Sequence, residues 1–203
     1  LRQRGRPDIR IFGGGGGVIV APEVRELEDY GISRIYSPGD GHRLGLQGMI
    51  WDMIERSDVD LASDLPSSID GITGGDHAAL ARAITGLEAG RLAPEMVAAI
   101  RDAAAKHAET PVLGITGTGG AGKSSLTDEL IRRFRLYSAD PSIAVIAIDP
   151  TRRKTKGALL GDRIRMNAID APNVYMRSLA TRDAKTEVPE ALGDIIAACK
   201  AAG

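Results

Sequence analysis

Gly117-Thr118-Gly119-Gly120-Ala121-Gly122-Lys123-Ser124 matches the phosphate-loop pattern G-x-x-x-x-G-K-[ST] at every fixed position. Glycines allow the backbone to turn its N–H groups inward around phosphate oxygens, where side chains would otherwise crowd. In this pattern Lys123 reaches the β and γ phosphates, and the hydroxyl of Ser124 holds Mg²⁺. The stretch therefore predicts a nucleotide site. Its predicted binding residues are Gly117, Gly119, Gly120, Ala121, Gly122, Lys123, Ser124 and Ser125, with Lys123 as the catalytic residue.

The sequence on either side of the loop supports this prediction. Upstream, residues 111–116 are mostly apolar and predict a short buried strand. Downstream, a helix is predicted to begin near Lys123, because apolar residues recur at helical spacing: Leu126, Leu130, Ile131 and Phe134. The phosphates would then lie at the positive N-terminus of that helix.

Composition excludes several classes of partner. The 26 basic and 27 acidic side chains give a formal net charge of −1, which offers no general attraction for nucleic acid or an anionic membrane. Aromatic residues are only 3% of the chain, which disfavours a platform for stacking bases. The longest uncharged run, residues 11–22, is too short and too rich in glycine to span a bilayer. We therefore expect no nucleic-acid or membrane partner.

The single cysteine and the first residues of the chain indicate where the protein is located and whether the chain is part of a longer protein. Cys199 is the single cysteine, so no internal disulfide can form and a cytoplasmic location is expected. The first residues lack an initiator methionine and the apolar segment of a signal peptide. We expect an internal section of a longer protein.

The chain divides into three predicted blocks. Residues 1–56 alternate strand, helix, strand and helix, which is typical of the closing part of a parallel doubly wound α/β domain. Its predicted elements are strands at 9–12 and 32–36 and helices at 22–30 and 44–56. Residues 57–109 are predicted as a linker, to about residue 75, followed by an alanine-rich helical segment. Residues 110–203 form a third block around the phosphate loop, with further strands at 143–148 and 173–178 and a helix at 188–200.

Two aspartates are candidate Mg²⁺ ligands. Asp149 ends a continuously apolar strand, at the edge of the sheet where a nucleotide, Mg²⁺ and attacking water gather. Asp162 follows thirteen residues later, and the residues alone leave open whether it binds metal or caps a helix. The basic run at 152–156, which lies between them, is either a nucleotide-sensing loop or solvated surface.

The first block carries a second glycine-rich segment. Gly13, Gly14 and Gly15 begin a run that ends at Gly17, and such a run permits close approach of the backbone to a ligand. The run does not match the dinucleotide pattern G-x-G-x-x-G. Residues 40–45 match D-x-H-x-x-G, the signature of proteins in which a histidine replaces the lower ligand of cobalamin. The motif stands here after the last strand of the block, so we interpret His42 as an exposed loop histidine.

Two separate segments resemble one family. Residues 111–170, with GITGTGGAGKSS and VIAIDPTRRKTKGALLGDRIRMNAI, together with the preceding DHAALARAITGLEAG, resemble the GTPase chaperones that service methylmalonyl-CoA mutase. Residues 9–50, with IRIFGGGGGVIVAPEV, GISRIYSPGDG and LGLQGMI, resemble the end of a cobalamin-binding domain of acyl-CoA mutases. A cobalamin domain followed by a chaperone GTPase is similar to the members of this mutase family in which both are fused.

The resemblance implies a fold and a set of cofactors. The fold would be α/β: the end of a flavodoxin-like cobalamin domain, a helical linker, and part of a phosphate-loop NTPase sheet. GTP and Mg²⁺ would bind at the loop, with Ser124, Asp149 and Asp162 at the metal. Adenosylcobalamin would lie with its nucleotide tail along Gly13 to Gly17. The longer protein would be a homodimer that rearranges an acyl-CoA.

Two other functions stay open at this stage. One is a freestanding phosphate-loop ATPase or kinase, since the guanine-specific motif N/T-K-x-D is absent and the choice of GTP rests on the resemblance. The other is a non-enzymatic module with a vestigial loop. Relative affinity for GTP and ATP separates the three hypotheses.

Overall fold

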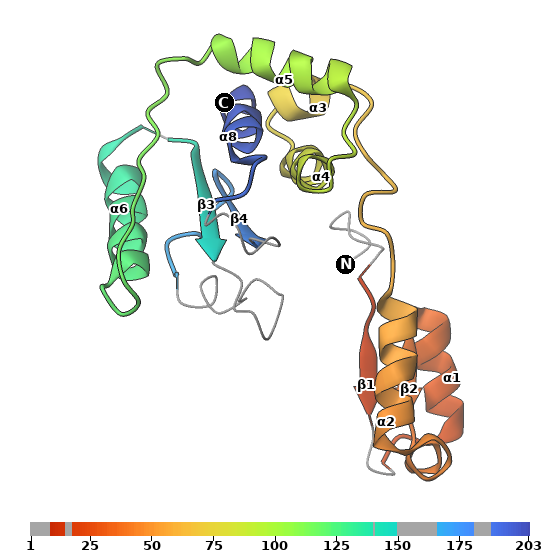
Figure 1. Ribbon diagram of the computed structural model, residues 1–203. Helices are drawn as coiled ribbons and strands as arrows, with labels where there is room; N and C mark the ends of the chain where they lie inside the picture. Colours follow the sequence, from red (N-terminus) through yellow and green to blue (C-terminus); the bar gives the residue numbers. More distant parts are fainter. Residues whose placement is uncertain (1–8, 15–17, 140, 150–165, 181–187) are drawn as a thin grey trace. The chain divides into compact units, whose positions relative to one another are not determined.

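The computed structural model describes residues 9–14, 18–139, 141–149, 166–180 and 188–203. The chain forms two compact units, Leu1–Leu61 and Ala62–Gly203, and each is described by itself. Figure 1 shows both units as α/β structures in which helices flank short parallel sheets.

The first unit contains the alternation of strands and helices that the sequence predicts. Its elements are β1 (Phe12–Gly14), α1 (Ala21–Tyr30), β2 (Arg34–Tyr36) and α2 (Pro38–Ser57). β1 and β2 pair in parallel, with Gly13 opposite Ile35. The helix predicted at 44–56 begins earlier, because Ser37 caps it and Pro38 occupies its first turn. Gly45, at φ 65°, interrupts this helix with a kink.

The second unit holds the phosphate loop and a larger core. Three helices precede the loop: α3 (Asp70–Thr73), α4 (His77–Glu88) and α5 (Pro94–Ala105). After the loop come α6 (Lys123–Tyr137), β3 (Ile143–Asp149), β4 (Val174–Ala180) and α8 (Leu192–Ala201). β3 and β4 pair in parallel, from Ile143 opposite Val174 to Asp149 opposite Ala180.

The β3–β4 sheet is covered on both faces because successive strand residues point to opposite sides. On one face Val145, Val174 and Met176 pack with Ile131 of α6. On the other face Ile146, Ile148 and Leu179 join a larger core. That core is built from apolar residues of α3, α4, α5 and α8, among them Ile72, Leu80, Ile84, Ile100 and Ile195, all at most 2% exposed.

One predicted strand is absent from the structure. Residues 111–116 have no strand conformation, so the predicted strand before the phosphate loop, which we also expected to lie beside residues 143–148 in one sheet, is wrong. Val112 is 60% and Leu113 is 70% exposed. An apolar run becomes a strand only when a neighbour satisfies its backbone hydrogen bonds, and within the described residues β3 pairs with β4 alone.

Candidate functional site

The phosphate loop has the backbone conformation that its glycines allow. Gly120 and Gly122 have φ values of 82° and 81°, in the left-handed region that side chains disfavour. Gly122 caps α6, and the first intrahelical bond runs from the N–H of Leu126 to the carbonyl of Gly122 at 2.9 Å. The N–H groups of Lys123, Ser124 and Ser125 therefore lie in the helix turn that lacks intrahelical acceptors. This turn is suited to anion binding because it combines these donors with the positive end of the helix dipole.

Lys123 is held by its own loop. Its Nζ donates to the carbonyl oxygens of Gly117 at 2.8 Å and Thr118 at 2.9 Å. An ammonium group has three N–H donors, so these two bonds leave one for a phosphate oxygen. The side chain is half-buried, as is that of Ser124, whereas the loop glycines are exposed. The lysine is therefore oriented before any nucleotide binds, which reduces the entropy lost on binding.

The structure brings the loop and the end of β3 to the same end of the unit. Figure 1 shows that α6 begins, and β3 ends, at the lower end of the second unit as drawn. Asp149 is the last residue of β3, so its backbone lies at this edge. Asp162 and the basic run at 152–156, for which the sequence also predicts a role at this site, lie outside the described residues. Within the described part of the chain, no cluster of three or more His, Cys, Asp or Glu residues is arranged to hold a metal.

The first unit has a hollow at the carboxyl ends of its strands. Its volume is about 540 Å³, and it is lined by Phe12, Gly13, Gly14, Tyr36, Ser37, Pro38, Gly41, Met49 and Met53. Ligands of open α/β sheets bind at this edge. Gly14 borders the hollow with no close neighbour, whereas a Cβ on Gly13 would lie 2.8 Å from Cδ1 of Ile35. A side chain at position 13 would thus force the terminal methyl group of Ile35 to move. Gly15 lies outside the described residues.

Asp40 organises the charged groups beside this hollow. Its carboxylate accepts hydrogen bonds from the N–H and hydroxyl of Ser37 at 3.0 and 2.8 Å, and from Arg34 and Arg43 at 3.1 and 2.9 Å. The bond from the Ser37 backbone, followed by the Ser37 hydroxyl and Arg43, holds the pKa of Asp40 well below its usual value. Asp40 therefore stabilises the first turn of α2. His42 is exposed, as predicted, but it lies on that helix and not in a loop.

Tyr36 lines the same hollow and has an unusual pKa. Burial, together with the hydrogen bond that its hydroxyl donates to Asp52 at 2.7 Å, raises the pKa of Tyr36 to about 12. The phenol therefore stays neutral at physiological pH and presents an apolar ring to the hollow.

The parallel sheet and the loop at the start of α6 define the class: a phosphate-loop nucleotide-binding protein of α/β fold. The family model of the methylmalonyl-CoA mutase-associated GTPase MeaB matches residues 80–203, and the chain belongs to that family. The family model thus confirms the resemblance of residues 111–170 to the GTPase chaperones of methylmalonyl-CoA mutase.

Curated relatives extend the match to the whole chain. The chain is 64% identical over 203 residues to the fused isobutyryl-CoA mutase of Cupriavidus metallidurans, covering 100% of this chain and 18% of that protein. The corresponding protein of Geobacillus kaustophilus is 53% identical over 209 residues, with 100% and 19% coverage. A putative GTPase of Pyrococcus horikoshii is 39% identical over 129 residues, covering 63% of this chain and 39% of that protein. The chain thus spans about a fifth of the length of the fused mutases that it matches.

Among the helices that the structure describes, none is both long enough and apolar enough to cross a membrane.

Proposed function

We propose that this chain is the nucleotide-handling section of a cobalamin-dependent acyl-CoA mutase, in which binding and hydrolysis of GTP gate the loading of cobalamin. The observation that carries the proposal is the loop at the start of α6. There Lys123 is oriented by two carbonyl oxygens, and the N–H groups of residues 123–125 precede the first intrahelical hydrogen bond. The family and the names of the fused relatives support the link to a mutase.

Different groups of the loop would bind the phosphates and the Mg²⁺ of the nucleotide. The helical N–H groups and the remaining N–H of Lys123 would bind the β and γ phosphates, and Ser124 would ligate Mg²⁺. Asp149 and Asp162 are the proposed acidic partners of the metal. In hydrolysis, water attacks the γ phosphorus, the bond to the bridging oxygen breaks, and charge develops on the phosphate oxygens. Lys123 would stabilise that charge electrostatically.

The first unit is the proposed end of a flavodoxin-like cobalamin domain. An open, largely apolar hollow beside the glycine backbone at Gly14 fits part of a bulky ligand. We assign it to the nucleotide tail of adenosylcobalamin, which supplies radical chemistry when bound. The reaction of the longer protein would be the interconversion of isobutyryl-CoA and n-butyryl-CoA. A cytoplasmic homodimer is the proposed state of that protein.

Relative nucleotide affinity tests the proposal. In the intact protein, GTP should bind more tightly than ATP, and Lys123→Ala should lower the rate of GTP hydrolysis by about a hundredfold or more, because one preorganised donor contributes at least that much. Lys106→Ala, which removes a charge from the exposed end of α5, is the matched control and should leave the rate unchanged. A clear preference for ATP would favour the ATPase or kinase alternative, and no measurable affinity would favour a vestigial loop.

A further inference from the structure

One wall of the hollow in the first unit is formed by α2, which a kink divides into two helical segments. The dihedral angles of Gly45, φ 65° and ψ 172°, are not helical, so the helix is interrupted there. Before the kink, Pro38 and Gly41 line the hollow. Beyond the kink, Met49 and Met53 line it. All the residues that line the hollow lie in the described part of the chain, and Figure 1 shows α2 over β2.

Each segment of α2 is held to β2 by an aspartate. Before the kink, Oδ1 of Asp40 accepts a hydrogen bond from Arg34 at 3.1 Å. Beyond the kink, Oδ2 of Asp52 accepts a hydrogen bond from the hydroxyl of Tyr36 at 2.7 Å. Arg34 and Tyr36 are two positions apart on β2, so their side chains point to the same face of the sheet. The two bonds therefore hold both segments against that face.

The bond at Asp52 joins a buried donor to an acceptor whose orientation is fixed. Tyr36 is 5% exposed, so its hydroxyl needs a partner within the protein. Nε of Arg56, one turn further along α2, lies 3.0 Å from both carboxylate oxygens of Asp52 and orients them. A hydrogen bond to an ionised acceptor is stronger than one between neutral groups. Asp52 therefore determines where the wall formed by Met49 and Met53 lies relative to the ring of Tyr36.

We propose that Asp52 is a positioning residue for the ligand of the hollow. It does not line the hollow itself, but it holds Met49 and Met53 opposite Tyr36 and so fixes the width of the hollow before the ligand arrives. A preformed hollow binds more tightly, because less conformational freedom is lost on binding. The inference rests on the proposed function, since it assigns a further role at the site proposed for the nucleotide tail of adenosylcobalamin.

The intact protein, freed of cofactor, allows a direct test with matched variants. Asp52→Ala removes the acceptor, and Asp52→Asn retains a side-chain oxygen that can accept the same bond. Tyr36→Phe removes the donor but keeps the ring that lines the hollow. Glu55→Ala removes an equal charge from an exposed position of the same helix and is the control. The measurements are the Kd for adenosylcobalamin, from the change in its absorbance spectrum, and the melting temperature of each variant without ligand.

We expect Asp52→Ala and Tyr36→Phe each to raise the Kd about tenfold, as the loss of one hydrogen bond to a charged group does. The double variant should bind no more weakly than either single variant, because both changes remove the same bond. Asp52→Asn and Glu55→Ala should bind adenosylcobalamin within about twofold of the wild type, since both keep that bond.

A wild-type Kd in both Asp52→Ala and Tyr36→Phe would overturn the inference, even if the melting temperature falls, because the bond would then support the fold alone. An equal loss of affinity in Glu55→Ala would also overturn it, since charge and not position would then be the cause. Additive losses in the double variant would show that the two residues do not act through one bond, which contradicts the inference. A wild type that does not bind adenosylcobalamin would instead refute the function proposed for the first unit.

Discussion

The ionised carboxylate of Asp40 contributes to the stability of the first unit. It is the third residue of α2, its side chain is only 13% exposed, and its carboxylate receives hydrogen bonds from Ser37, Arg34 and Arg43. These bonds favour the charged form, which is why its pKa in the folded state lies below the unfolded value. The stabilisation is present above the unfolded pKa of about 4 and is lost as pH falls below it.

Asp40→Asn should therefore reduce the free energy of unfolding of the first unit by about 1 kcal/mol near neutral pH, as loss of a helix cap does. The difference from the wild type should shrink as the pH falls from 4 to 2, since the carboxylate of the unfolded wild-type chain then takes up a proton, whereas in the folded state, where the pKa of Asp40 is lower, it stays ionised. Urea unfolding followed by the fluorescence of Trp51, which lies on α2, measures both effects. A difference that stays constant through this pH range would contradict the assignment.

Gly13 offers a test that separates packing from ligand binding. Gly13→Ala should destabilise the first unit by about 1–3 kcal/mol, because the added methyl group would overlap Cδ1 of Ile35. Ile35→Val removes that atom, so the double variant should recover part of the loss. Thermal unfolding of the single and double variants measures the recovery. If the double variant is no more stable than Gly13→Ala, the constraint on this glycine lies elsewhere.

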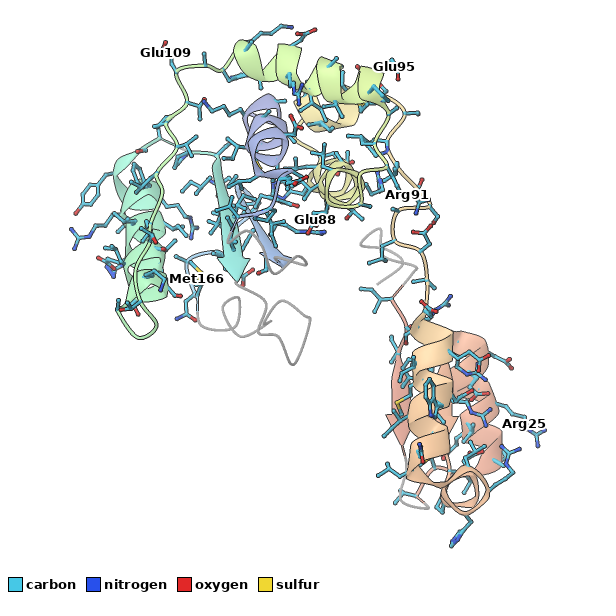
Figure 2. The ribbon with its side chains drawn as sticks, viewed as in Figure 1. Arg25, Glu88, Arg91, Glu95, Glu109 and Met166 are labelled. Atoms are coloured by element: carbon cyan, nitrogen blue, oxygen red, sulfur yellow. The ribbon has the colours of Figure 1, made fainter. Side chains whose placement is uncertain are left out.

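At the scale of elements, two ion pairs join the helices before the phosphate loop to the elements after it. Glu88 of α4 accepts a bond from Arg177 of β4 at 2.6 Å, and Thr85 adds a second contact at 3.2 Å. Glu88, labelled in Figure 2, is the last residue of α4. Arg101 of α5 binds Asp194 of α8 through two bonds, at 2.6 and 3.0 Å. The side chains of the first pair are 30% and 14% exposed, whereas Arg101 is 63% exposed.

The less exposed ion pair, Glu88–Arg177, should contribute more to the stability of the second unit than the pair Arg101–Asp194. Glu88→Ala should lower the free energy of unfolding of the second unit by about 2 kcal/mol, because it leaves the partly buried guanidinium of Arg177 without its carboxylate. Asp194→Ala should cost about 0.5 kcal/mol, since an exposed pair is screened by water and salt. Chemical denaturation of both variants gives the comparison. Equal losses of unfolding free energy in the two variants would show that exposure to solvent does not determine how much each ion pair contributes.

The sequence predicts helices well because their signals are local. The apolar faces of α4 and α5 follow helical spacing, and Pro94 lies in the first turn of α5. The phosphate loop also follows from local residues, since its glycines adopt the positive φ values that the pattern requires. The apolar pattern that predicts a helix from residue 44 misses the start of α2, which is set by the cap at Ser37 and by Pro38.

Contacts between residues that are far apart in the chain leave no comparable pattern in the sequence. The apolar residues 112–116 predict a strand, but strand formation depends on a partner elsewhere in the chain. Arg177 and Glu88 are 89 residues apart, and Asp128 and Ala168 are 40 apart. Within their own segments, Arg177, Glu88 and Asp128 are of residue types that are common at protein surfaces. Their roles depend on how β4 and the segment before it pack, which periodicity does not encode.

At the scale of the molecule, the nucleotide site and the hollow at Gly14 belong to different compact units. A ligand stabilises the cooperative unit that binds it, by an amount set by its concentration relative to its Kd. GTP with Mg²⁺ should therefore increase the stability of Ala62–Gly203 selectively. The loop leads into the first turn of α6, and Ile131 of that helix packs against the sheet, so protection should extend through this unit.

Hydrogen exchange in the 203-residue chain tests this expectation. At a GTP concentration of about 100 times Kd, the slowest amides of β4 and α8 should exchange about a hundredfold more slowly, which corresponds to about 2.7 kcal/mol. The amides of α2 should exchange at unchanged rates, because α2 belongs to the other unit. Lys123→Ala should remove the protection of β4 and α8, since it disables the loop without altering the core. Equal slowing of α2 and α8 would mean that the two units unfold as one, and that nucleotide binding is transmitted to the unit that contains the hollow.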